Sequence, residues 1–234
     1  MCAVLLSKFP LWTSFTASVL NLASVTLERY FSICYPLRYN TFFTYNNVRA
    51  LLITVWLAAF TMNSYMFYVF KFNGTGCYID WYTKGFQIFL GMCNFSVIYA
   101  IPLLTMAVCY VLIMLNLSHA AKNLRQSTGK ESQASLELLS ARRKVVKMLA
   151  TVVITFAICW APNQFIFLAY NLGFDLDFTS WYYHFSVLIA FCNSCMNPMI
   201  YGFRSKSYRR ALKIAMCGRS SVVGDNNTEL TFEP

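Results

Sequence analysis

Glu28 and Arg29 stand side by side at the end of a long apolar stretch, and Tyr30 follows them directly. An ionised pair inside a hydrophobic helix is costly unless it is partnered or close to water. Such a pair is therefore expected to be either an anchor at a membrane surface or a working part of the protein. Which of the two applies depends on the other residues that the fold brings to Arg29.

Enzyme and metal chemistry have little support. The two histidines, His119 and His184, lie outside or at the edge of the apolar segments. Five of the nine cysteines lie inside apolar runs, where a free thiol behaves as a small hydrophobe. No Cys-x-x-Cys pair or Cys/His cluster has zinc-ligand spacing, and no nucleophile stands near a base in a recognisable pattern. We expect neither catalytic residues nor a metal site.

The composition is that of a membrane protein. The chain has 234 residues, of which 58% are hydrophobic and 12% charged, whereas a soluble domain carries about 25% charged residues. Five apolar segments reach the length of about 20 residues that a spanning helix needs; they are approximately 2–33, 48–70, 86–117, 145–172 and 181–203. These segments predict an all-α, multi-span transmembrane bundle.

Basic residues gather in three stretches, 29–49, 122–147 and 204–219, whereas the opposite side carries Lys8, Lys71 and Lys84. The net charge of +10 invites a nucleic-acid partner, but membrane topology explains the basic loops better. The positive-inside rule places the C-terminus in the cytoplasm. It also places the Asn73 glycosylation sequon outside.

The tail has two parts. Residues 205–217 alternate apolar and basic side chains at helical spacing, which is typical of a helix lying in the membrane interface. Cys217 ends this helix and is either a palmitoylation site or an ordinary free thiol. Residues 218–234 are polar and are expected to be a disordered tail.

Three predicted spans contain an internal proline, at Pro102, Pro162 and Pro198. Each proline removes one helical hydrogen bond, and the freed carbonyl needs protein or water as its partner. We therefore expect these three sites to face the bundle interior, although proline is also common in membrane helices without a special role.

Several motifs occur in a fixed order along the chain. They are Glu28-Arg29-Tyr30 with Tyr35-Pro36-Leu37, then Trp56, Pro102 with Tyr110, Phe156, Cys159-Trp160-Ala161-Pro162, Asn193-Ser194, and Asn197-Pro198-Met199-Ile200-Tyr201 with Phe203. Together they resemble the rhodopsin-like (class A) G-protein-coupled receptors over about residues 3–217. The resemblance implies a single receptor bundle, 1–217, and assigns roles to individual residues.

The implied activation switch at the cytoplasmic face comprises Glu28, Arg29, Tyr30, Pro36, Leu37, Tyr110, Asn197, Pro198 and Tyr201. An apolar connector between this switch and the ligand site would be Val19, Pro102, Phe156 and Trp160. A remnant of the family's sodium-binding cluster would be Ser18, Asn193, Ser194 and Asn197. No other cofactor is implied.

The outer halves of the helices offer aromatic and amide side chains as ligand contacts, namely Trp12, Phe15, Asn163, Gln164, Phe167, Tyr170 and Tyr183. Leu11 stands where amine receptors carry an acid, and Arg142 stands where many amine and light receptors carry one. Leu11 argues against an amine ligand, whereas Arg142 and the aromatic and amide side chains resemble the peptide-receptor branch. Asp175 and Asp177 in an outer loop would favour a basic peptide end, or are simply solvated.

The chain also departs from the family. It has five predicted spans instead of seven, and the family's first two helices, with the aspartate of the sodium site, have no counterpart. Cys77 matches one half of the family disulfide, but its partner position is held by Val4, so that Cys77 either pairs with Cys2 or stays unpaired. We expect weak folding or signalling of this chain alone.

The expected function is therefore a plasma-membrane receptor, or a fragment of one, that binds an extracellular peptide or other small ligand. It would activate a heterotrimeric G protein and could recruit arrestin. The alternative is a truncated, non-signalling form that associates with full-length receptors. A transporter is disfavoured, since the mid-spans lack charged residues and no repeat is visible.

Overall fold

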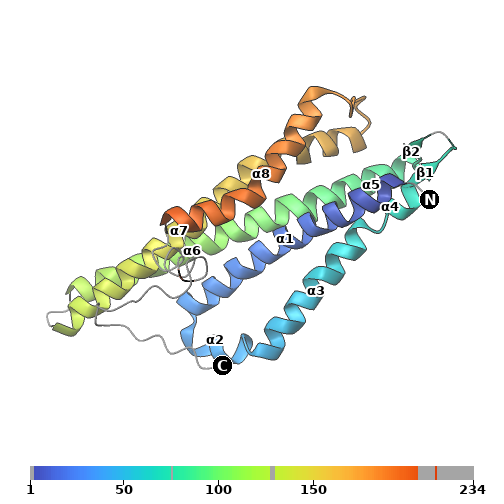
Figure 1. The fold of residues 1–234 in the computed structure, drawn as a ribbon. Helices are drawn as coiled ribbons and strands as arrows, with labels where there is room; N and C mark the ends of the chain where they lie inside the picture. Colours follow the sequence, from blue (N-terminus) through green and yellow to red (C-terminus); the bar gives the residue numbers. More distant parts are fainter. Residues whose placement is uncertain (1–2, 75, 127–129, 205–213, 215–234) are drawn as a thin grey trace.

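The computed structural model describes residues 3–74, 76–126, 130–204 and 214. Five long helical rods form one bundle (Figure 1). They are α1 (Ala3–Cys34), α3 (Tyr45–Asn63), the continuous rod α5 (Lys84–Phe95), η1 (Ser96–Ala100) and α6 (Ile101–Gln126), then α7 (Lys130–Asn171) and α8 (Trp181–Arg204). The predicted helical bundle is confirmed, and four of its five rods begin within three residues of the predicted segments; α7 begins much earlier.

Shorter elements connect the rods. Helix α2 (Pro36–Phe42) joins α1 to α3, and α4 (Met66–Val69) leads into a hairpin of β1 (Phe70–Phe72) and β2 (Cys77–Ile79). The strands pair antiparallel, with Phe70 opposite Ile79 and Phe72 opposite Cys77. The sequence did not predict this hairpin because three-residue strands are too short to show a period of two.

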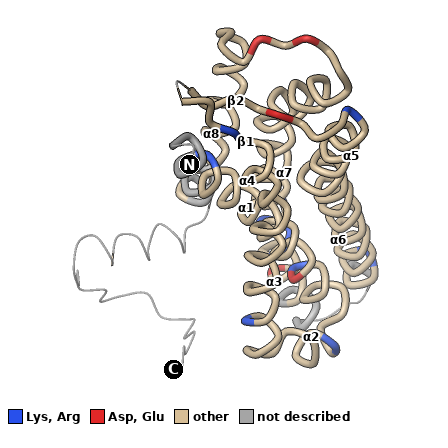
Figure 2. The backbone as a smooth tube through the Cα atoms, turned by 90° about the vertical axis from the view of Figure 1, so that its right-hand side faces the viewer, with Lys and Arg blue, Asp and Glu red and all other residues tan. Residues whose placement is uncertain are grey.

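Three described segments are long and apolar enough to cross a membrane, namely Tyr45–Val69, Lys84–Leu124 and Ser135–Asn171. Helices α1 and α8 were also predicted to span. They lie in the same bundle (Figure 1) but contain many hydroxyl and amide residues, which lower their hydropathy. Acidic positions in the loops gather at the end of the bundle that carries β1 and β2, opposite α2 (Figure 2).

Three hydroxyl side chains of α1 are satisfied within the bundle, whereas Thr13 Oγ1 is buried without a partner among the described residues. Thr16, Ser24 and Thr26 each donate a hydrogen bond of 2.9 Å to the carbonyl four residues earlier. Asn63 of α3 then donates from Nδ2 to Thr16 Oγ1 at 3.0 Å and to the Ala59 carbonyl at 2.8 Å. Such pairing removes the free-energy penalty of placing unpaired polar groups in a medium without water.

Local sequence sets several helix ends. The Oγ1 atoms of Thr44 and Thr83 accept from backbone amides in the first turns of α3 and α5, as N-cap residues do. Helix α7 ends at Asn171, because Gly173 adopts a left-handed backbone with φ of 101° and the Phe174 amide bonds back to the Ala169 carbonyl.

The prolines differ in their surroundings. Pro102 is buried and follows the π-helical turn η1, in which the Ile101 amide reaches back to the Ser96 carbonyl. Pro162, however, is exposed, so the prediction that it faces the bundle interior is wrong. A proline ring pushes against the preceding turn and bends the helix away from itself, which leaves the ring outside. The Pro198 side chain lies outside the described residues.

Helix α5 approaches α7 closely at one glycine. A Cβ atom at Gly91 would lie 2.3 Å from Asn171 Cβ and 2.8 Å from Asn171 Cγ. Neither atom belongs to the flexible end of a long side chain. The two helices can therefore keep this spacing only with glycine at position 91.

We predict that Gly91→Ala destabilises the fold by about 1–3 kcal/mol, because the added methyl group must push α5 and α7 apart. Thermal unfolding of the purified chain in nanodiscs measures the effect. Gly85→Ala is the matched control in the same helix, since its Cβ would meet nothing closer than Thr83 Oγ1 at 4.0 Å. Equal melting temperatures for the two variants would contradict the packing argument.

Candidate functional site

At the α2 end of the bundle, two neighbours hold the Glu28 carboxylate. Arg29 Nε lies 3.2 Å from Glu28 Oε2, and the Tyr39 hydroxyl donates to Glu28 Oε1 at 2.7 Å. Each carboxylate oxygen therefore has its own partner. The Arg29 side chain remains 45% exposed, so this end of α1 presents a cation to solvent with its acid held beside it.

Tyr39 reaches Glu28 because α2 folds back on α1. Pro36 begins α2, where a missing amide hydrogen has no cost. The Phe31 ring packs against Tyr35, Phe42 and Phe43 at centroid distances of 5.8–6.1 Å. Sequence reasoning missed Tyr39, because nothing in its spacing shows that α2 would turn toward Glu28.

The bond to Glu28 raises the pKa of Tyr39, since the phenol must stay protonated to donate, and partial burial adds to the effect. A group whose pKa is raised on folding stabilises the folded state below its unfolded pKa. This contribution of Tyr39 is therefore present at neutral pH and is lost as the pH rises through the raised pKa.

The other predicted switch residues are placed in part. Tyr30 packs against the main core, Tyr110 is buried within it, and the Leu37 side chain is 95% exposed. The side chains of Asn197, Pro198 and Tyr201 lie outside the described residues, as does that of Ser194. Their convergence on Arg29 stays a prediction.

Two basic residues near the start of the buried part of α7 behave differently. Arg142 is exposed. Its neighbour Arg143 donates from Nη2 to the Leu117 carbonyl of α6 at 3.1 Å. Sequence reasoning did not single out Arg143, since adjacent arginines in a loop carry no signal of which one turns inward.

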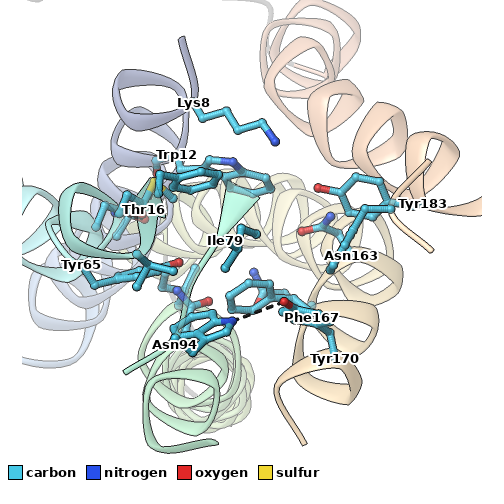
Figure 3. Close-up of a pocket in the computed structure, with 18 of the residues that line it drawn as sticks. Lys8, Trp12, Thr16, Tyr65, Ile79, Asn94, Asn163, Phe167, Tyr170 and Tyr183 are labelled. Carbon is cyan, nitrogen blue, oxygen red and sulfur yellow. Dashed lines mark hydrogen bonds between the residues drawn. The ribbon is translucent and has the colours of Figure 1, made fainter. Parts of the chain in front are cut away.

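A pocket of about 240 Å³ opens at the opposite end of the bundle (Figure 3). Six of the predicted ligand residues line it, namely Trp12, Asn163, Gln164, Phe167, Tyr170 and Tyr183, and Trp160 lines it as well. Phe15 was also predicted to line the pocket, and it does not. Its ring is buried, because it packs edge-on against Trp160 at 5.3 Å and against Phe191 at 5.0 Å.

Part of the pocket wall was not predicted. It comes from α3, α4, the hairpin and α5, and includes Asn63, Tyr65, Met66, Phe70, Ile79, Trp81 and Asn94, together with Lys8 and Thr16 of α1. Trp81 Nε1 donates to the Tyr170 hydroxyl at 3.3 Å and so joins the segment after β2 to α7. A hairpin folded over a pocket leaves no periodic signal in the sequence.

The pocket floor contains polar groups without a partner among the described residues. Asn163 and Gln164 are each 3% exposed, and Trp160 is 2% exposed. Gln164 Oε1 and Trp160 Nε1 are buried and make no hydrogen bond there. A buried polar atom without a partner costs roughly 1–3 kcal/mol, so a ligand that supplies a donor and an acceptor would lower this cost once the two side chains turn toward the pocket.

The predicted connector lies directly below the floor. Val19, Phe156 and Trp160 belong to one buried cluster of α1, α6, α7 and α8, and Phe156 meets Trp160 at 6.1 Å. Pro102 is buried beside η1. The packed side chains therefore continue from the pocket floor to Tyr110 and Tyr30 without leaving the core.

Of the predicted sodium cluster, only the side chains of Ser18 and Asn193 lie within the described residues. Ser18 is exposed, whereas Asn193 is buried with Oδ1 unpaired in the described part of the chain. Neither helix supplies a carboxylate at this depth, since α8 has no acid and Glu28 is the first acid of α1. Neutral oxygens alone compensate a buried positive charge poorly.

The predicted modifications meet the described residues only in part. Cys77 is disulfide-bonded, but Cys2 lies outside the described residues, so that their pairing stays a prediction. Asn73 is exposed in the β1–β2 turn, where its Oδ1 accepts from the Gly76 amide at 2.9 Å. Cys217 and the helix predicted over 205–217 lie outside the described residues, apart from Ile214, which is helical.

The outer-loop acid Asp177 is hydrogen-bonded within its own loop. Asp177 Oδ1 accepts from the Thr179 amide at 2.8 Å and from its hydroxyl at 2.6 Å. These bonds lower the pKa of Asp177. Neither Asp175 nor Asp177 lines the pocket, so the structure gives no support to the idea that they receive a basic ligand.

Comparison with known proteins identifies the family of this chain. Residues 1–201 match the model of the 7 transmembrane receptor (rhodopsin family). The chain belongs to the rhodopsin family of seven-transmembrane receptors. It is therefore a multi-pass membrane protein, and family membership confirms the prediction of a receptor and not an enzyme.

Curated relatives include galanin receptors. The receptor is 31% identical over 212 residues to galanin receptor 2a of Danio rerio, covering 88% of this chain and 56% of the relative. It is 32% identical over 232 residues to galanin receptor 2b of the same species, covering 93% and 59%. Galanin receptor type 2 of Mus musculus is 27% identical over 216 residues, covering 90% and 56%. The chain thus spans less than two thirds of the length of these relatives.

The fold itself matches that of squid rhodopsin. The TM-score is 0.72 at 19% sequence identity, and the match covers 92% of this chain and 65% of squid rhodopsin. At this identity the match concerns the fold alone.

We predict that Tyr39→Phe loosens the α2 segment, because Glu28 Oε1 loses its donor. Hydrogen exchange of the amides in residues 37–42 should become several-fold faster, as expected for a lost charge-assisted bond. Tyr45→Phe is the matched control, since Tyr45 is 81% exposed and close in sequence. Identical exchange in the two variants would show that the Tyr39 bond does not hold α2.

Proposed function

We propose that this receptor binds an extracellular peptide in the pocket under the β1–β2 hairpin. In this proposal the α2 end faces the cytoplasm of the plasma membrane and activates a heterotrimeric G protein. The observation that carries the proposal is the continuity of α1. The same helix lines the pocket with Trp12 and Thr16 and carries the Glu28–Arg29 pair at its other end.

The packing suggests how ligand binding would reach Arg29. A ligand on the floor would press on Trp160, whose ring contacts both Phe15 and Phe156. Close-packed side chains respond to such pressure by switching between discrete arrangements. A shift of α7 relative to α6 would then strain the bond from Arg143 to the Leu117 carbonyl and open the end at which Arg29 is exposed.

The identity of the relatives favours a peptide ligand. Three of them are galanin receptors by name, and the aromatic and amide lining of this pocket suits a peptide. Galanin is accordingly the first probe to test. Arrestin recruitment is a further expectation of this proposal.

A second candidate is a non-signalling form that associates with full-length receptors. One observation favours it: Ser18 is exposed on a helix of an apolar bundle, where a polar side chain gains from a neighbouring helix. The two candidates differ in one readout, because only the first predicts nucleotide exchange by the G protein.

The proposal is tested by measuring nucleotide exchange on a purified heterotrimeric G protein. The 234-residue chain and a version extended by the two N-terminal helices of a galanin receptor are placed in nanodiscs, with galanin as agonist. We expect agonist-dependent exchange that Arg29→Ala reduces at least tenfold. Exchange that does not depend on Arg29, or no exchange from either version, would contradict the proposal.

Arg142→Glu should lower the basal exchange of the extended version about fivefold. The new carboxylate would pair with Arg29 and add an inter-helix restraint, and exposed pairs of this kind contribute up to about 1 kcal/mol. Arg142→Gln is the control, since it removes the positive charge without adding an acid. Basal exchange that is unchanged or raised in Arg142→Glu would count against an inter-helix role of this position.

A further inference from the structure

One charged side chain lies at the mouth of the pocket. Lys8 extends from α1 across the opening, toward the side that carries Asn163 and Tyr183 (Figure 3). Its Nζ atom lies 5.7 Å from the centroid of the Phe70 ring of β1. The described lining contains no Asp or Glu, so the field of Lys8 at the mouth is not cancelled by a neighbouring carboxylate.

Lys8 differs from Lys71 in the surroundings of its charge. Lys71 lies in β1, next to Phe70. Its Nζ is 2.8 Å from Asp80 Oδ2, and both side chains are about half exposed. Its charge is therefore neutralised within the protein. Lys8 instead borders a largely aromatic cavity and is exposed at its mouth, so its attraction for an anion is partly screened by water and salt.

The pocket floor adds a second requirement. Gln164 Oε1 is a buried acceptor and Trp160 Nε1 a buried donor, and neither is paired within the described structure. Both residues line the pocket, so a rotation of each side chain would bring these atoms to the pocket surface. An amide group supplies both complements, because its N–H donates and its C=O accepts. The floor therefore favours an amide group, whereas the positive charge at the mouth favours an anionic group on the same ligand.

We propose that the pocket selects a peptide segment carrying a carboxylate, which pairs with Lys8 Nζ at the mouth while an amide of the same segment meets Gln164 and Trp160 at the floor. The proposal rests on the peptide-receptor function given above and specifies its ligand chemistry. It replaces the expectation of a basic peptide end, since Asp177 is engaged by Thr179 and lies outside the pocket lining.

Three small probes test this selection on the 234-residue chain in nanodiscs. N-acetyl-tryptophan carries an α-carboxylate, N-acetyl-aspartyl-tryptophanamide carries a side-chain carboxylate, and N-acetyl-tryptophanamide is neutral. We expect at least one of the two acids to bind about fivefold tighter than the neutral amide, as a partly exposed ion pair allows. The preference should shrink at high salt. The tighter acid shows whether a chain terminus or a side chain supplies the carboxylate.

Lys8→Gln should abolish this preference while leaving the affinity for the neutral probe unchanged. Lys8→Arg keeps the charge and should keep the preference. Lys71→Gln is the matched control and should bind like the wild type. A melting temperature for each variant checks that the fold is intact.

Equal binding of acid and amide probes by the wild type would overturn the inference, as would an acid preference that survives Lys8→Gln. Binding of none of the three probes would overturn it too. Failure of the proposed signalling function looks different. In that case the acid preference persists in binding, while no peptide stimulates nucleotide exchange.

Discussion

The structure depends on one constraint, the need to pair the polar groups of α1 inside an apolar bundle, and within the described residues Thr13 Oγ1 is buried without meeting it. Thr16, Ser24 and Thr26 meet it by bonding to carbonyls of their own helix, and Asn63 of α3 caps Thr16 from the side. Once these groups are satisfied, α1 can lie against α3 on one side and α6 on the other. The position of α1 then fixes both functional ends, because Trp12 and Glu28 are carried by the same rod.

The two ends are built on different physical principles. The pocket end combines aromatic walls with unpaired polar atoms on Trp160 and Gln164, so it gains from an added molecule. At the α2 end, both oxygens of Glu28 have partners within the chain, and the Tyr39 bond persists across the physiological pH range. The rhodopsin-family receptor thus has unpaired polar atoms at the end where a ligand is expected. At the end where a G protein is expected, the Glu28 carboxylate is already held by partners.

The sequence alone predicts the helices and most pocket residues well, because apolar length and ordered motifs are local signals. Six of seven predicted ligand residues line the pocket, and Phe15 fails because its ring turns inward to Trp160. Tyr39, Arg143 and Lys8 were not predicted as site residues. Each acquires its role only when another segment, namely α1, α6 or the hairpin, folds against it, and such contacts between distant segments leave no spacing pattern.

The length of α7 makes the position of its far end sensitive to the bend at Pro162. Its 42 residues extend for about 63 Å, roughly twice the thickness of a bilayer core. About 48 Å of that length lies between Pro162 and the start of the helix at Lys130. A change of about 10° in the bend at Pro162, well within what a proline kink permits, would therefore sweep the far end through about 8 Å. In the proposed activation, a small adjustment near Trp160 would thus be amplified along α7 into a much larger displacement at its far end.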